Sequence, residues 1–261
     1  MNILFWNTGL KKKRESNIHN INASLPELVT ENNVDLLILA EYNADIQLTC
    51  NSINSQTNPR IKFNPIPICG CEKIRGLVKS KYNVKPLRDH SRYQIVKIST
   101  ASYMLIIGMV HNVDKYSYTV REQEEVLRWF HDEIVAVEKE NNCTNTIVIG
   151  DFNANPFEAS CAGAGMMHGL PFIGNIADKP ERTIQGRSYH KFYNPTWKFY
   201  GNIDTPHTTY HFDNGEIVNF YRNAFDQVMV RPRLINAFDV SKLKIIGCTS
   251  NHQLTKNGKP D

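Results

Sequence analysis

The strongest constraint on the fold of this chain is a set of short apolar runs that end abruptly at a polar residue. In TIVIGDFN (146–153), a β-branched run gives way to Gly-Asp-Phe-Asn. A short run of this kind predicts a strand that is buried on both faces of a sheet. An unpaired carboxylate at the end of such a strand is costly to bury. Polar residues in these places are therefore expected to be solvated, metal-bound or catalytic.

Four strand ends in the chain have this character. Asn7 follows NILFW, Glu41 follows LLILA, His111 follows LIIGMV, and Asp151 with Asn153 follows TIVIG. From position alone, Glu41 is equally well explained as a ligand for Mg²⁺ or Mn²⁺ and as a salt-bridged residue in a turn. Asp151 and Asn153 could face one side of an extended strand or form an Asx turn. His111 could be a general base, a phosphate donor or a structural histidine.

The spacing of apolar residues indicates mixed secondary structure. Apolar residues three and four apart predict helices over 18–31 and 120–141. Two long polar stretches, 43–60 and 159–191, are predicted as loops. Strands are predicted at 2–6, 36–39, 76–78, 93–98, 103–110, 146–149, 221–230 and 243–246. Because the order is not strictly strand-helix-strand, stacked sheets flanked by helices are favoured.

Charge and cysteine content bound the partners and the compartment. A net charge of +4 over 261 residues permits a phosphate-rich partner without requiring one. Six scattered cysteines fit reduced thiols in a cytoplasmic protein better than a disulfide framework. No apolar stretch reaches the roughly 18 residues typical of a membrane span. Export and membrane insertion are therefore not expected.

Two clusters of basic residues are candidates for contact with a phosphate backbone. The plain alternative for such a cluster is a solvated turn. The first cluster follows Asn7 and the second falls near the third predicted strand: Lys11, Lys12, Lys13 and Arg14, then Lys73, Arg75, Lys79 and Lys81. If both clusters are loops at the mouth of a site, nucleic acid is the expected partner.

Together with FDQVMV at 225–230, these strand ends resemble the endonuclease/exonuclease/phosphatase superfamily, which includes deoxyribonuclease I and exonuclease III. The likeness spans nearly the whole chain. Asn7 matches the family's first-strand Asn, Glu41 its metal-binding Glu, His111 its middle His, Asp151 and Asn153 its GDxN motif, and Asp226 its late acidic residue. The resemblance implies one α/β domain over 1–261, a four-layer sandwich of two mixed β-sheets packed face to face with helices outside.

The resemblance also implies a chemistry. Glu41, helped by Asn7, would hold Mg²⁺ or Mn²⁺, and Asp151 would orient or deprotonate the attacking water. Asn153 would steady the water or the phosphate, and His111 would act as acid, base or phosphate donor. Asp226 would hold a terminal histidine in its tautomer. The function implied is a metal-dependent phosphodiesterase acting on nucleic acid, DNA more than RNA, with no membrane partner.

Two other classes stay open at this point. One is a catalytically impaired module of the same fold that binds nucleic acid or a partner protein. The other is a small-molecule phosphatase or phosphodiesterase, which would share the metal site and differ in pocket shape. Similar bacterial proteins often accompany defence genes, so the resemblance also suggests a role in bacterial defence.

The chain departs from the family at its C-terminal end. The family closes with Ser-Asp-His and a final core strand, whereas the nearest local match is Ser250-Asn251-His252. One interpretation is that the sequence stops before the true motif and lacks the final strand. The other is a substituted motif in which His252 is the terminal histidine. A missing strand would leave a sheet edge exposed unless a partner protein covers it.

Overall fold

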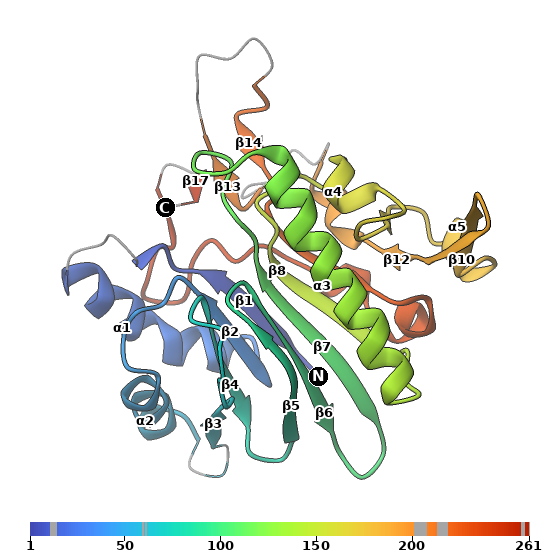
Figure 1. Ribbon diagram of the computed structural model, residues 1–261. Coiled ribbons are helices and arrows are strands. Elements are labelled where there is room, and N and C mark those ends of the chain that lie inside the picture. The colour runs from blue at the N-terminus through green and yellow to red at the C-terminus, as the bar shows by residue number, and fades with distance from the viewer. Residues whose placement is uncertain are drawn as a thin grey trace.

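The computed structural model describes residues 1–10, 15–58, 60, 62–200, 208–212, 219–256 and 259–260. Two large β-sheets pack face to face, and helices cover their outer faces (Figure 1). The predicted four-layer α/β sandwich is thus confirmed. The layers matter for function because they bring the ends of both sheets to one place.

The first sheet has the strand order β1 (Ile3–Asn7), β2 (Leu36–Ala40), β4 (Ile74–Lys79), β3 (Phe63–Pro65). β1 and β2 run parallel, and β4 runs antiparallel to β2 and β3. The run LLILA in β2 is buried throughout because both faces are covered. Leu36 and Ile38 face the core between the sheets, and Leu37 and Leu39 face α1 (Glu15–Glu31) and α2 (Ile46–Gln56).

The second sheet has the strand order β5 (Asn83–His90), β6 (Tyr93–Ser99), β7 (Met104–His111), β8 (Thr146–Asp151), β15 (Asp226–Val230), β12 (Phe192–Tyr193), β9 (Gly169–Leu170). β7 and β8 run parallel, and β15 runs antiparallel to β8. Helix α3 (Val120–Glu140) covers the outer face, and Phe130 and Ile134 pack on it. A capping box between Thr119 and Glu122 fixes the start of α3.

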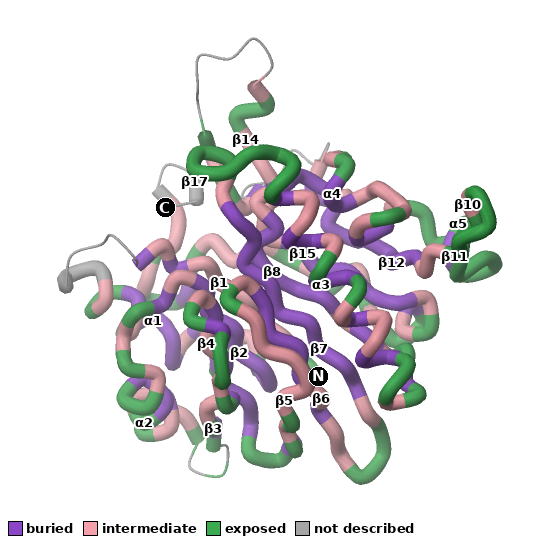
Figure 2. Tube along the Cα trace, viewed as in Figure 1, coloured by how far each residue is buried: buried purple, intermediate pink, exposed green. Residues whose placement is uncertain are grey.

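Smaller elements lie around this sandwich. They are α4 (Ala159–Ala162), α5 (Gly174–Ala177), the strand pairs β10 (Glu181–Ile184) with β11 (Arg187–His190), β13 (Tyr210–His211) with β14 (Arg222–Asn223), β16 (Thr255–Lys256) with β17 (Lys259–Pro260), and 3₁₀ helices at Pro195–Phe199, Pro232–Ala237 and Val240–Lys242. Figure 2 shows β7 and β8 buried along most of their length, whereas β10 and β11 are largely exposed.

Some of the helices, strands and loops predicted from the sequence are confirmed, and others are wrong. The helices predicted at 18–31 and 120–141 are confirmed as α1 and α3. The loop predicted at 43–60 is wrong, because α2 forms there behind the N-cap Asp45 although few of its residues are apolar. The loop at 159–191 is also wrong, since short helices and strands interrupt it. No strand forms at 243–246.

β5 was missed by the sequence pattern for a physical reason. It is an edge strand of the second sheet, so its residues are only partly buried and lack a clear apolar alternation. Pro86 stands beside an irregularity in its pairing with β6, where a proline is tolerated. Polar composition therefore hides this strand.

Two further properties bear on the predictions. Among the described residues, no helix is both long and apolar enough to cross a membrane. All six cysteines carry free thiols, and four of them are buried. The first sheet, as far as it is described, has β1 as an outer strand.

Candidate active site

The predicted site residues converge at one end of the sandwich. Asn7, His111 and Asp151 are the last residues of β1, β7 and β8, and Glu41 follows β2 directly. Parallel strands end at the same sheet edge, and β15 runs the opposite way, so Asp226 at its start pairs in register with Asp151. The strand ends of both sheets thus meet.

Polar contacts join the two sheets at this end. The Asn7 amide donates to Asp151 Oδ2 at 2.8 Å, which links β1 to β8. His111 Nε2 lies 3.6 Å from Glu41 Oε1 and 3.9 Å from Asp151 Oδ2. His111 and Asp151 are buried, whereas the Glu41 side chain keeps 25% of its exposure. A ligand can therefore reach Glu41 while the other two are shielded from bulk water.

The turn after β8 explains the sequence Gly-Asp-Phe-Asn. A Cβ at Gly150 would lie 1.9 Å from the Val110 carbonyl oxygen of β7, and the φ of Gly150 is +156°, so only glycine fits there. Asp151 Oδ1 accepts from the Asn153 N–H at 2.7 Å. Asn153 itself has a φ of +49°, which asparagine tolerates better than most residues. The Asx-turn alternative is therefore correct for the backbone, and the turn holds Asp151 at the strand end.

Sequence reasoning missed two buried residues that support this turn. The Asn112 backbone carbonyl accepts from the Asn153 side-chain amide at 2.9 Å. The Asn112 side-chain amide donates to the Phe152 carbonyl at 3.1 Å. Gln123 donates to the Asn153 carbonyl at 3.2 Å and to the Val113 carbonyl at 2.8 Å. A signal was present for Gln123, because it is a polar residue on the apolar face of α3.

Glu41 is held in a conformation that few non-glycine residues adopt. Its φ is +49°, in the left-handed region. Thr8 Oγ1 donates to the carbonyls of Ala40 and Glu41 at 3.0 and 3.1 Å, and the Glu41 N–H donates to the Lys73 carbonyl at 3.1 Å. These bonds fix the turn and so direct the Glu41 carboxylate towards His111. Backbone strain of this kind is concentrated at functional sites.

Negative charge accumulates at this end of the sandwich. The pKa of Asp151 is raised to about 6, chiefly by burial; hydrogen bonds from Asn153 and Asn7 oppose the shift, and the negative charges of Glu41 and Asp114 add to it. Burial also raises the pKa of Asp226 well above its usual range, and the charge of Asp151 adds to this. The site therefore favours neutralisation by a proton or by a cation.

These residues fit a hard divalent cation. Mg²⁺ takes oxygen ligands and is usually held by one or two carboxylates, with water and substrate oxygens completing the shell. Glu41 offers a partly exposed carboxylate and Asn7 an amide beside it, in a place rich in negative charge. Among the described residues, no three His, Cys, Asp or Glu side chains form a ready cage for a metal ion. The donor set therefore suits a metal that shares its coordination with substrate.

The structure describes only some of the basic residues that were predicted to contact phosphates. Lys11, Lys12, Lys13 and Arg14 lie outside the described residues. Arg75 lies near the site end of β4, and its guanidinium donates to the carbonyls of Cys71 and Ile74 at 3.1 and 2.9 Å. Whether Arg75 also contacts nucleic acid stays a prediction.

Lys79 and Lys81 are in the wrong place for the predicted role. Both form ion pairs with Asp35, at 3.1 and 3.3 Å. Asp35 precedes β2, whereas Glu41 follows it, so these lysines lie at the opposite end of the first sheet. The prediction that they border the site is therefore wrong, because antiparallel β4 carries the chain away from it.

His252 lies beside α1. Its Nδ1 is 3.1 Å from Glu27 Oε2, and its backbone N–H donates to Thr249 Oγ1 at 3.0 Å. Within the described part of the chain, the side-chain contacts of His252 are with Thr249 and Glu27, so the structure does not pair it with Asp226.

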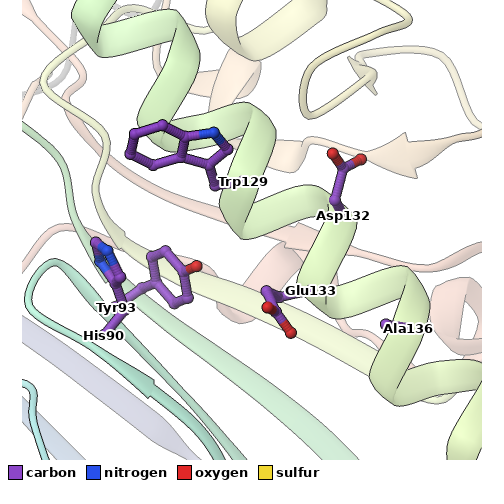
Figure 3. Close-up of a pocket in the computed structure, with 6 residues that line it drawn as sticks. All are labelled: His90, Tyr93, Trp129, Asp132, Glu133 and Ala136. Atoms are coloured by element: carbon purple, nitrogen blue, oxygen red, sulfur yellow. The ribbon is translucent and has the colours of Figure 1, made fainter.

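A surface hollow elsewhere shares none of these residues. His90, Tyr93, Trp129, Asp132, Glu133 and Ala136 line it (Figure 3). The His90 and Tyr93 rings stack at 4.7 Å between centroids, and Glu133 is paired with Arg88. Its residues come from α3 and from the β5–β6 hairpin, so it lies apart from the strand ends that carry Asp151.

No protein-family model and no curated protein sequence matches the chain. Solved structures do. Truncated TDP2 from Caenorhabditis elegans matches with a TM-score of 0.54 and 16% identity, over 87% of this chain and 82% of that one. TDP2 from D. rerio, complexed with a single-strand DNA product, matches with a TM-score of 0.51 and 17% identity, over 88% and 82%.

The catalytic domain of human Nocturnin matches with a TM-score of 0.52 and 12% identity, over 88% of this chain and 82% of that one. These identities are low, so the likeness concerns the fold. It agrees with the resemblance that the strand-end motifs carry. The chain therefore has the fold of the endonuclease/exonuclease/phosphatase superfamily, to which these proteins belong.

Proposed function

We propose that this protein is a phosphodiesterase that hydrolyses nucleic acid, DNA in preference to RNA, with Mg²⁺ or Mn²⁺ as its cofactor. The observation that carries the proposal is the cluster in which Asn7 and Glu41 of one sheet meet His111 and Asp151 of the other. Residues 1–261 would form one domain, as the resemblance predicts.

Glu41 and Asn7 are the residues that would hold the cation. When bound, a divalent cation neutralises charge on a non-bridging phosphate oxygen as the phosphorus becomes five-coordinate. The partly exposed Glu41 carboxylate and the excess negative charge around Asp151 support this assignment. The Asn7 amide also ties the cation ligand to the carboxylate that handles water.

The remaining residues would act on the water and the phosphate. Asp151 orients the water and takes its proton as the water oxygen attacks phosphorus, and the ester P–O bond on the far side breaks. His111 donates to a phosphoryl oxygen or protonates the leaving oxygen, so the products are a phosphomonoester and an alcohol. Asn153 steadies the water or the phosphate, supported by Asn112.

Asp226 is assigned a positioning role. It pairs in register with Asp151, and its N–H donates to Thr209 Oγ1 at 3.0 Å. When Asp226 is ionised, its negative charge raises the proton affinity of the Asp151 carboxylate. The prediction that Asp226 holds a terminal histidine rests on the family resemblance alone.

Several observations support the choice of substrate and setting. The net charge of +4 suits a polyanion, and D. rerio TDP2 was solved with a single-strand DNA product. ANGEL2, which matches with a TM-score of 0.52 and 14% identity over 88% of this chain and 82% of that one, is described as a 2′,3′-cyclic phosphatase. Six free thiols suit the reducing cytoplasm. A partner protein that covers the C-terminal edge and a role in bacterial defence stay predictions.

The test is nicking of supercoiled plasmid with Mg²⁺ or Mn²⁺, comparing the wild type with Glu41→Gln and Asp151→Asn. Both substitutions keep the shape of the side chain and remove its charge. We expect metal-dependent nicking that each variant lowers by about 100-fold or more. A Lys242→Gln variant is a matched control, because the Lys242 side chain is 82% exposed and its ion pair is with Asp239, three residues away in sequence.

Other outcomes would point to the alternative classes. DNA binding without cleavage would indicate a catalytically impaired module. Absence of both, with hydrolysis of phosphorylated small molecules, would indicate a phosphatase or small-molecule phosphodiesterase. Nicking that is equal in the wild type and both variants would contradict the assigned site.

A further inference from the structure

Aromatic side chains are exposed on the β13–β14 hairpin next to the catalytic carboxylates. Tyr210 and Phe212 remain 44% and 45% exposed. Their rings lie 6.2 Å apart at an angle of 20°, and Tyr210 lies 5.1 Å from Phe225 at 22°. The three rings thus form one stack, Phe212–Tyr210–Phe225, in which Phe212 and Tyr210 are exposed and Phe225 is half-buried.

The stack begins at the catalytic end of the second sheet. Phe225 precedes Asp226, and its carbonyl accepts from the Phe152 N–H of the turn after β8 at 2.8 Å. Thr209, which precedes Tyr210, accepts from the Asp226 N–H. Burial of part of Tyr210 raises its pKa, and the charge of Asp151 raises it further. A group lying on this stack would therefore be a near neighbour of the phosphate at Asp151.

The hairpin is held in place by contacts with the same turn region. The Phe212 N–H donates to the Tyr221 carbonyl at 3.0 Å, which joins its two arms. Asn155 then joins the hairpin to the turn region, since its amide donates to Asn223 Oδ1 at 2.9 Å. Asn155 Oδ1 also accepts from the Ala224 N–H at 3.1 Å. The rings are therefore fixed relative to the catalytic residues.

Positive charge accompanies the stack. Lys115 Nζ lies 5.3 Å from the centroid of the Phe225 ring. It also pairs with Glu158 at 2.6 Å, and the Lys115 side chain is 39% exposed. Flat apolar rings with a cation beside them match a strand of nucleic acid, which alternates flat bases with phosphates.

We propose that the Phe212–Tyr210 face binds an unpaired base, so that the preferred substrate is single-stranded beside the scissile phosphate. A base within a duplex is stacked on its neighbours and offers a protein only its edges, whereas an unpaired base can lie on an aromatic ring. This inference rests on the proposed function, because it names the form of nucleic acid that the same site accepts.

The test compares binding and cleavage of two probes by the purified protein. The probes are a fluorescein-labelled oligo-dT and a hairpin duplex of similar length, titrated in EDTA for affinity and then incubated with Mn²⁺ for cleavage. The variants are Tyr210→Leu and Phe212→Leu, with Tyr210→Phe to retain the ring. Trp129→Leu is the matched control, since Trp129 is also 45% exposed but lies on α3.

We expect oligo-dT to bind more tightly than the duplex. Each Leu variant should weaken oligo-dT binding by about 5- to 150-fold, the range for loss of one base–aromatic stack, and leave duplex binding unchanged. Tyr210→Phe and Trp129→Leu should match the wild type. Circular dichroism of each variant shows whether it is folded, and Tyr210→Phe separates loss of the ring from loss of the hydroxyl.

Three results would overturn the inference, and they can be told apart. Equal binding of both probes, with unchanged affinity in the Leu variants, would contradict the stacking face while leaving the nuclease assignment intact. If the Leu variants lost binding of the duplex and of oligo-dT alike, the rings would belong to a surface that contacts nucleic acid of either form, and would not be a face that stacks on an unpaired base. Absence of binding and of Mn²⁺-dependent cleavage in the wild type would contradict the proposed function as well.

Discussion

Two neighbouring regions at the end of the sandwich that carries the candidate site have opposite characters. The turn after β8 is polar and largely buried: Asp151 is 6% exposed, both of its carboxylate oxygens accept hydrogen bonds, and the Asn153 side-chain amide donates one. The β13–β14 hairpin is apolar and exposed at Tyr210 and Phe212. Proteins usually bury aromatic side chains and expose polar ones, and these two regions do the reverse. Either arrangement costs free energy unless a bonding partner or a ligand compensates for it.

The difference between these regions indicates that they have different roles. The turn must place a carboxylate to within a fraction of an ångström, so it is fixed by bonds from two sheets and from α3. The hairpin needs only to present a flat apolar surface, so its side chains can stay exposed. We expect substitutions in the turn to change both stability and rate, and substitutions in the hairpin to change binding.

The largest effect is expected from Gly150→Ala. The added Cβ would overlap the Val110 carbonyl at 1.9 Å, so β8 must shift relative to β7. The free energy of unfolding should fall by about 3 kcal/mol or more, and hydrolysis by about 100-fold or more. Urea unfolding and plasmid nicking measure these. The control is Gly174→Ala, where nothing lies within 4 Å of an added Cβ, and equal behaviour of the two variants would contradict the role given to the turn.

The next effect concerns pH in the absence of metal. The pKa of Asp151 is about 6 in the folded protein against 3.8 for an ordinary Asp. Between these values the folded state holds a proton that the unfolded state has lost, so the contribution of Asp151 to stability is full below about 4 and is lost as pH rises through about 6. Asp151→Asn should therefore gain roughly 2–3 kcal/mol relative to wild type between pH 4 and 7, measured by urea unfolding in EDTA. A constant difference would contradict the raised pKa.

Asn112→Ala should have a smaller effect on both properties. It removes the buried side-chain amide that donates to the Phe152 and Gln123 carbonyls, while the backbone carbonyl that accepts from Asn153 stays. We expect a loss of about 2 kcal/mol and about a tenfold fall in kcat with little change in KM. Asn145→Ala is the matched control, because its amide donates to the Met104 carbonyl at the far end of β7. If both variants lower kcat alike, the bond at the turn has no special role.

Glu41 offers a test of stored strain. A glycine relieves the left-handed φ of +49°, whereas Glu41→Gln keeps it. Glu41→Gly should be more stable than Glu41→Gln by about 1 kcal/mol in EDTA, while neither variant hydrolyses DNA. Urea unfolding of the pair measures the difference. A less stable glycine variant would show that the turn is not strained.

The smallest effect is expected from Phe212→Ser on the hairpin. Because Phe212 is 45% exposed, the free energy of unfolding should change by less than about 0.5 kcal/mol. Thermal unfolding measures it. A loss comparable with that of Asn112→Ala would mean that the hairpin is part of the core structure, and the contrast between the two regions would fail.

The candidate site could largely be predicted from the sequence, because polar residues at the ends of buried strands leave a local pattern. Asn7, Glu41, His111 and Asp151 were all found this way, and parallel pairing then brings them together. The aromatic face could not be predicted. Tyr210, Phe212 and Phe225 look like ordinary strand residues, and only the pairing of β13 with β14 and the start of β15 makes them a stack.

The placement of the basic residues shows the same limit. Arg75 and Lys79 lie close in sequence, yet a single antiparallel strand carries them to opposite ends of the sheet. Charge counts along the chain do not record strand direction. The edge strand β5 was missed for a related reason, since partial exposure removes the apolar pattern that marks a buried strand.

The central claim is that the strand ends of the two sheets form one cation-assisted phosphodiesterase site. Its most direct test is a titration of the purified protein with Mn²⁺, followed by electron paramagnetic resonance of the free ion. The claim predicts Mn²⁺ binding that Glu41→Gln weakens by about tenfold or more, together with loss of DNA nicking in that variant. Mn²⁺ binding that is absent from the wild type, or equal in the wild type and Glu41→Gln, would contradict it.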